Sequence, residues 1–130
     1  MRKIVKINNF DSIETISGTG YIRVSANVLI NIFGYPEKSE SYKSDWTWRL
    51  TLDDNNVIEI YDWKIGKNYN SDDGLELEEM NLWCTGSSGS DYKKRVENKY
   101  YLLNLIDLCK EDWGKSNNTK LKMFFNLEEI

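Results

Sequence analysis

The side chains that could do acid–base chemistry in this sequence are carboxylates, because its 130 residues contain no histidine. Without imidazole, Ser-His and Cys-His nucleophilic pairs and histidine-containing metal sites are excluded. Asp45, Glu59 and Asp62 stand near aromatic residues, and apolar surroundings could raise the pKa of one of them. No spacing pairs them as an acid and a base, so we predict no catalytic residue.

Aromatic residues are the sharpest chemical feature, at 13% of the chain. They gather in the run SDWTWRLTLDDNNVIEIYDWKIGK at residues 44–67. Exposed rings could stack on a nucleobase or on a partner's side chain, whereas buried rings would fill the core. Lysines beside them would contact an anion. The candidate ligand- or partner-binding residues are Lys43, Trp46, Tyr61, Trp63, Lys64 and Trp83.

A glycine- and serine-rich stretch comes directly before a predicted helix. Backbone N–H groups at a helix N-terminus can bind an anion such as phosphate. No Gly-Lys-Ser/Thr follows, so this is not a P-loop, and a plain surface loop explains the composition equally well. The candidate anion-binding residues are Thr85, Gly86, Ser87, Ser88, Gly89 and Ser90.

The acidic run from Asp72 to Glu79 fails as a calcium-binding EF-hand loop. Aligning its glycine leaves Met80 at the position of the bidentate ligand. We therefore predict no metal and no cofactor, and the run could instead dock a basic protein partner. Cys84 and Cys109 are expected to be reduced and buried.

Net charge limits the class of partner. A charge of −4 and a pI near 4.9 argue against nucleic acid, which needs a concentrated positive surface. The N-terminal residues lack the apolar run of a signal peptide, and no stretch reaches the ~18 apolar residues of a spanning helix. We expect a cytoplasmic protein with no membrane partner, and a homo-oligomer stays open.

Alternating apolar residues and turn residues predict the strands that would position these side chains. Strands are expected at residues 2–7, 45–52, 57–63, 80–84 and 120–127, with a hairpin turn at 53–56 and a loop or hairpin at 11–20. Trp46 and Trp48 share a face with two leucines, which favours the core for at least one of them. Tyr61 and Trp63 alternate with isoleucines on the opposite face, so we expect these two rings to be exposed.

Helical spacing predicts two helices. The first lies within 22–33, with Ser25 as its N-cap and Gly34 and Pro36 as its stop. The second lies at 92–112, and its apolar stripe consists of Val96, Tyr100, Leu103 and Ile106, widened by Leu102, Leu105 and Cys109. The chain therefore predicts a single α+β domain at 1–130, in which an antiparallel sheet of about four to five strands carries both helices on one face.

Several pieces of the sequence together resemble a domain of small, uncharacterised proteins of bacteriophages and large DNA viruses. The matching pieces are Phe33-Gly34-Tyr35-Pro36, Lys43 with Asp45 and Trp48, Ile60-Tyr61-Asp62-Trp63-Lys64, and Trp83-Cys84-Thr85-Gly86. The resemblance covers residues 20–106 and implies a viral setting more than a known activity. Cys84 stands where the family usually has a histidine, so the resemblance implies no histidine chemistry at this position.

The aromatic excess and this resemblance favour a non-enzymatic viral accessory module that binds a host protein, with counter-defence as its purpose. An alternative is a binder that sequesters a nucleotide-derived signal. It would stack the base on Trp63 or Trp83 and hold the phosphate at residues 85–90. A small hydrolase is disfavoured because histidine is absent.

Overall fold

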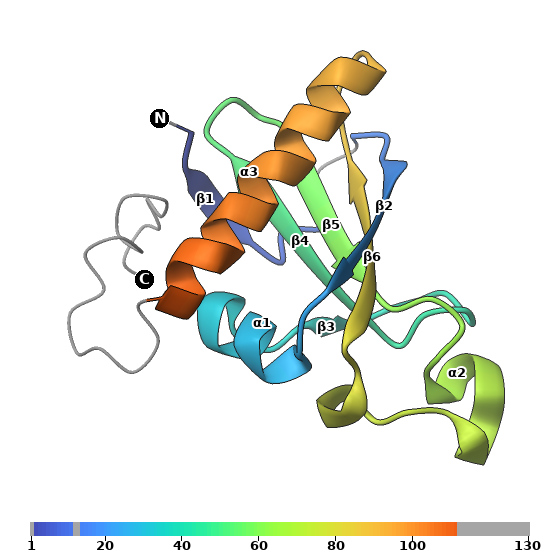
Figure 1. Ribbon diagram of the computed structural model, residues 1–130. Coiled ribbons are helices and arrows are strands. Elements are labelled where there is room, and N and C mark those ends of the chain that lie inside the picture. Colours follow the sequence, from blue (N-terminus) through green and yellow to red (C-terminus); the bar gives the residue numbers. More distant parts are fainter. Residues whose placement is uncertain (1, 12–13, 112–130) are drawn as a thin grey trace.

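The structure, a computed structural model, describes residues 2–11 and 14–111 and is built around a six-stranded antiparallel sheet (Figure 1). The strands are β1 (Ile4–Ile7), β2 (Ser17–Arg23), β3 (Glu37–Lys38), β4 (Trp46–Leu52), β5 (Val57–Tyr61) and β6 (Leu82–Ser87). Five of them lie in the order β1-β4-β5-β6-β2, and the short β3 pairs with β4.

Two helices, α1 (Ala26–Phe33) and α3 (Tyr92–Glu111), cover one face of this sheet (Figure 1). The chain between β5 and β6 lies at one end of the sheet. It forms a short helix, α2 (Lys67–Asn70), and two 3-10 turns, η1 (Ser71–Asp73) and η2 (Leu77–Glu79). The predicted α+β architecture is confirmed. No helix among the described residues has the length and apolar composition to cross a membrane.

The centre of the core is a pair of tryptophans. Trp48 of β4 and Trp83 of β6 are fully buried, and their rings meet edge to face with 5.1 Å between centroids. The Trp83 indole N–H donates to the carbonyl of Val24, just before α1, over 2.9 Å. The Trp48 indole N–H donates to the carbonyl of Gly34, just after α1, over 2.8 Å. The two indoles therefore fasten both ends of α1 to the sheet.

Local capping explains the limits of α1. The Ser25 side chain accepts the N–H of Val28, and Gly34 ends the helix with φ 81°, a left-handed conformation that favours glycine. Both caps confirm the prediction. The predicted helical segment nevertheless started too early, because Ile22 and Arg23 belong to β2, where Ile22 pairs with Trp83. Pairing with β6 outweighs the helical spacing of these residues.

The predicted loop or hairpin at 11–20 is partly wrong, because residues 17–20 belong to β2, an edge strand of the sheet. Just before it, Ile16 packs on Gly86 of β6. A Cβ atom at Gly86 would lie 2.6 Å from the Ile16 Cγ2 atom, so only glycine allows this close approach.

The long helix is confirmed, and its buried stripe consists of Asn98, Leu102, Leu105, Ile106 and Cys109. Tyr100 was expected in the stripe and is wrong, because 62% of its surface is exposed. Polar Asn98 faces inward instead, where its amide donates to the Ser87 hydroxyl and the Ser88 carbonyl. The predicted strand at 120–127 lies outside the described residues.

Candidate binding surface

Three aromatic rings and two lysines gather at the surface where the β4–β5 hairpin opens. Tyr42 and Lys43 precede β4, Trp63 and Lys64 follow β5, and Tyr69 lies in α2. The rings are well exposed, at 65% for Tyr42, 40% for Trp63 and 45% for Tyr69. We call these five residues the aromatic–lysine surface.

The two ammonium groups lie over the rings. The Lys43 Nζ atom is 5.3 Å from the ring centre of Tyr42 and 5.3 Å from that of Trp63. The Lys64 Nζ atom is 5.8 Å from the ring centre of Trp63 and 5.5 Å from that of Tyr69. Tyr42 and Tyr69 stack on each other, with 6.3 Å between centroids. Exposed cation–π contacts contribute about 0.5–1 kcal/mol each, so together these contacts hold the five side chains in a defined arrangement.

Neither lysine of this surface forms an ion pair within residues 2–11 and 14–111. The ion pairs in those ranges are Arg2–Asp54, Arg49–Glu59, Lys67–Glu76 and Lys94–Asp54. Lys43 and Lys64 therefore present two positive charges to a molecule that approaches from outside.

A buried carboxylate joins the two ends of the hairpin. Asp62 is fully buried and accepts the backbone N–H groups of Asp45, at 2.9 and 3.0 Å, and of Trp46, at 2.8 Å. Next to it, the Lys64 N–H donates to the Lys43 carbonyl over 2.7 Å. Lys64 adopts φ 62°, a left-handed conformation that is uncommon outside glycine. These bonds place Lys43 and Lys64 side by side.

A second carboxylate holds α2, and with it Tyr69. The Asp45 side chain accepts the N–H groups of Lys67 and Asn68, each over 2.8 Å, at the start of α2. Gly66 makes room for this contact, because a Cβ atom there would lie 2.5 Å from the Asp45 carboxyl carbon. Asp45 and Asp62 thus position the surface by hydrogen bonds to the backbone.

The three carboxylates near aromatic residues all have partners. Burial raises the pKa of the Asp62 carboxyl, although hydrogen bonds from Asp45 and Trp46 oppose the shift. Burial also raises the pKa of Glu59, and the Arg49 guanidinium, 3.4 Å away, opposes it. Asp45, Glu59 and Asp62 therefore stabilise the hairpin and its surroundings through these hydrogen bonds and this ion pair.

Tyr61 adjoins the surface through an edge-to-face contact with Trp63, at 6.2 Å between centroids. A shallow hollow of about 210 Å³ lies beside this pair, with Tyr21 and Cys84 on its wall. Burial raises the pKa of the Cys84 thiol and so disfavours the reactive thiolate. Cys84 is a free thiol and only half-buried, whereas Cys109 is buried.

Two predicted members of the site lie elsewhere. Trp83 is wrong as a stacking platform, because it is fully buried and its N–H is bonded to Val24. Trp46 is half-buried and packs against the core on the helix-covered face. Its neighbour Thr47 pairs with Tyr61, so Trp46 points away from Tyr61. The structure brings together Lys43, Tyr61, Trp63 and Lys64.

Tyr42 and Tyr69 were missed because they lie outside the strands, where no periodicity marks them. One pattern could have found Tyr42. The dipeptides Tyr42-Lys43 and Trp63-Lys64 stand at the two open ends of one predicted hairpin, and antiparallel pairing brings such ends together.

The predicted anion-binding loop is wrong for its first half, since Thr85, Gly86 and Ser87 belong to β6. The side chains of Thr85, Ser87 and Ser88 are buried, and their hydroxyls bond within the protein. The Ser88 Oγ atom, for example, accepts the N–H of Val57 over 2.8 Å. These groups are not free to hold phosphate.

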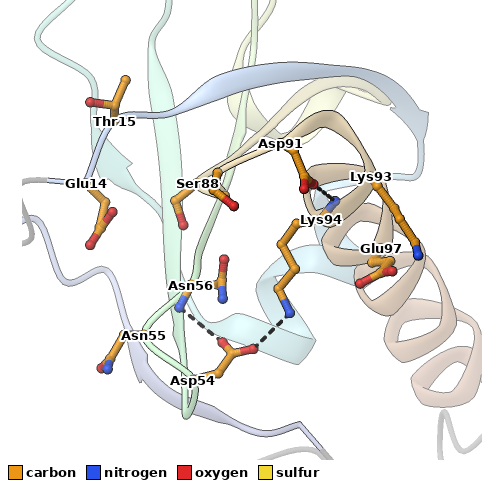
Figure 2. Close-up of a pocket in the computed structure, with 12 residues that line it drawn as sticks. Glu14, Thr15, Asp54, Asn55, Asn56, Ser88, Asp91, Lys93, Lys94 and Glu97 are labelled. Carbon is orange, nitrogen blue, oxygen red and sulfur yellow. Dashed lines mark hydrogen bonds and ion pairs between the residues drawn. The ribbon is translucent and has the colours of Figure 1, made fainter.

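A groove of about 880 Å³ runs between the β4–β5 turn, residues 88–91 and the start of α3, and Figure 2 shows the Lys94 side chain reaching from α3 toward Asp54 in the turn. Its charged lining consists of Glu14, Asp54, Asp91, Glu97, Lys93 and Lys94. Carboxylates therefore outnumber lysines, which does not suit an anion. The Asp91 carboxylate already accepts the Lys94 N–H at the start of α3.

The charges in this groove tie the hairpin turn to the helix and the N-terminal segment. Asp54 lies 3.5 Å from the Lys94 ammonium and 3.0 Å from the Arg2 guanidinium. Burial raises the pKa of the Asp54 carboxyl, but hydrogen bonds from Asn56 and the charge of Arg2 outweigh this effect, so the pKa is lowered overall. We interpret the groove as a structural clamp. Nowhere in the described part of the chain do three His, Cys, Asp or Glu residues gather to hold a metal ion.

Comparisons with known proteins do not add a function. No family model matches this sequence, and no curated protein is similar to it. The resemblance to the phage and viral domain stays a prediction. The geometry of the aromatic–lysine surface is therefore the basis for assigning a function.

Proposed function

We propose that this protein is a non-enzymatic binding module that engages another protein through the aromatic–lysine surface. The observation that carries the proposal is that Lys43 and Lys64, without ion-pair partners among the described residues, lie over the exposed ring of Trp63. Tryptophan and tyrosine dominate interface hot spots, and rings already held in place lose little entropy on binding. In keeping with the resemblance to phage and viral proteins, the partner is a host protein. The module is then a viral accessory protein that lies in the host cytoplasm and acts in counter-defence.

The shape of the surface favours a protein partner over a small molecule. The rings of Tyr42, Trp63 and Tyr69 lie on the outside of the molecule, and the hollow beside Trp63 measures only about 210 Å³. Small-molecule sites usually measure roughly 300–1,000 Å³ and enclose most of the ligand. An open surface of exposed rings suits a broad contact with another protein.

A capture experiment with two matched variants tests the proposal. Tyr100, on α3, is an exposed aromatic residue outside the surface, so Tyr100→Ala is the control for Trp63→Ala. We expect the tagged wild type and Tyr100→Ala to recover the same host protein in stoichiometric amount, and Trp63→Ala to lose it. Equal recovery by Trp63→Ala would refute the proposed surface.

A second candidate function is the sequestration of a nucleotide-derived signal, which the exposed Trp63 ring with Lys43 and Lys64 beside it favours. The base would stack on Trp63, and Lys43 or Lys64 would hold the phosphate in place of the hydroxyls of residues 85–88. This function predicts that heat denaturation of the purified protein releases a compound with nucleotide absorbance. It also predicts that adding the compound quenches Trp63 fluorescence. Purified protein without such a compound, and without quenching by added nucleotides, would rule it out.

A further inference from the structure

The chemistry of the partner can be inferred from the two charged regions that adjoin at this end of the molecule. The first is the pair of ammonium groups of Lys43 and Lys64. Aromatic rings carry partial negative charge on their faces and partial positive charge at their edges. The ring faces thus hold the ammonium groups, and the ring edges around them favour an anion. A carboxylate is the anion that a protein offers.

The second region is an acidic segment that we define by Asp72, Asp73 and Glu78. All three side chains are exposed, and none forms an ion pair within the part of the chain that the structure describes. The segment is fixed in place. Leu77 is buried in the core, and Gly74 approaches Gly66 so closely that a Cβ atom there would lie 2.3 Å from the Gly66 carbonyl oxygen.

The two regions are neighbours in the chain and in space. Tyr69 of the aromatic–lysine surface lies in α2, and the η1 turn that carries Asp72 and Asp73 follows α2 directly (Figure 1). An ion pair of 2.6 Å between Lys67 and Glu76 also ties α2 to the segment. A partner that covers the rings therefore meets positive charge first and negative charge next to it.

We propose that the partner is a protein whose contact face presents carboxylates to Lys43 and Lys64 and basic side chains to the acidic segment. This inference rests on the proposed function and specifies its partner. A nucleic acid has uniform negative charge along its backbone, so contact with the lysines would bring its phosphates toward Asp72 and Asp73. A protein face can carry both signs of charge at the spacing required, and mismatched charges would repel other proteins.

The test uses the full chain labelled with ¹⁵N and three probes: hexaglutamate, hexalysine and a short oligothymidylate. We expect hexaglutamate to shift the Trp63 indole N–H and the Lys64 amide, and hexalysine to shift the amides of the acidic segment. The double variant Lys43→Gln/Lys64→Gln removes both positive charges and keeps a polar side chain at each position. It should weaken hexaglutamate binding about tenfold and leave hexalysine binding unchanged. Lys93→Gln, at the start of α3 in the groove, is the matched control and should leave the binding of hexaglutamate and of hexalysine unchanged.

The remaining outcomes overturn the inference. If hexaglutamate shifts no resonance of the surface, or binds the double variant as tightly as the wild type, the surface is not a site for carboxylates. Oligothymidylate that binds the surface more tightly than hexaglutamate assigns it to nucleic acid instead. The capture experiment separates this inference from the proposed function. If Trp63→Ala loses the host protein while Lys43→Gln/Lys64→Gln retains it, the binding surface stands and its charge preference is wrong.

Discussion

The ammonium of Lys43 lies 5.3 Å from the centre of the Trp63 ring, although the whole β4–β5 hairpin separates the two residues in the sequence. The register of the hairpin, in which Thr47 pairs with Tyr61, brings its open ends together. The buried carboxylate of Asp62 then accepts the N–H groups of Asp45 and Trp46, at the start of β4. The candidate binding surface is thus a consequence of how the hairpin closes, and its rigidity can be tested at the residues that close it.

Removal of the Asp62 carboxylate should destabilise the fold. Asp62→Ala leaves the N–H groups of Asp45 and Trp46 without their acceptor, which costs about 1–3 kcal/mol for each buried donor. Asp72→Ala, at an exposed carboxylate, is the control and should change the free energy of unfolding by less than about 0.5 kcal/mol. Urea denaturation measures both. Similar stabilities for the two variants would show that Asp62 does not hold the hairpin.

Stability should depend on pH through the same carboxylate. Burial raises the pKa of Asp62 above its ordinary value of 3.8, so the folded state binds this proton more readily than the unfolded state. The stabilisation of the wild type relative to Asp62→Asn should therefore be greatest below pH 3.8 and decline as the pH rises through the folded pKa. Urea denaturation of both proteins between about pH 3 and about pH 8 measures the difference. If the stability difference between the two proteins grew with pH instead, the hydrogen bonds to Asp62 would lower its pKa by more than burial raises it.

Gly66 should be sensitive to a single methyl group. In Gly66→Ala the new Cβ atom would lie 2.5 Å from the Asp45 carboxyl carbon, so the contact between Asp45 and α2 must shift. We expect a loss of about 1–3 kcal/mol and altered amide resonances at Tyr69. Gly18→Ala is the control, because nothing lies within 4 Å of a Cβ atom there. Unchanged stability and an unchanged Tyr69 environment in Gly66→Ala would refute this role.

The tryptophans should separate cleanly into core and surface. Trp83→Phe removes the N–H that binds the Val24 carbonyl in the core, at a cost of about 1–3 kcal/mol for the bond alone. Trp63→Phe changes an exposed ring and should cost less than about 0.5 kcal/mol. Thermal unfolding compares the two variants. The quenching of tryptophan fluorescence by acrylamide should decrease in Trp63→Phe and should not decrease in Trp83→Phe. A decrease in Trp83→Phe without one in Trp63→Phe would contradict the assignment.

The features that are predicted best from the sequence are turns, helix ends and buried faces that residues close together in the chain determine. The hairpin turn at 53–56 follows from residues that tolerate left-handed conformations, and Asn55 adopts φ 67°. Ser25 and Gly34 mark the ends of α1. The alternation in β4 predicts a core position for at least one of Trp46 and Trp48, and Trp48 is fully buried. In each case the determining contact lies within a few residues.

What could not be predicted depends on contacts between distant segments. Ile22 joins a strand only because β6 pairs with it, and Trp83 is buried because α1 and α3 cover its face of the sheet. β6 is apolar at Trp83 and also at Cys84, on the other face, so its own pattern does not say which side is covered. Tyr69 reaches the surface because Asp45 holds α2.

Site-specific photo-crosslinking tests most directly whether the aromatic–lysine surface contacts a partner. A photo-crosslinking amino acid would replace Trp63 in one protein and Tyr100 in another, since both side chains are exposed. We predict that the first protein forms a covalent adduct with one host protein, that excess wild type suppresses it, and that the second protein forms none. An adduct at position 100 without one at position 63, or no adduct at either, would contradict the account.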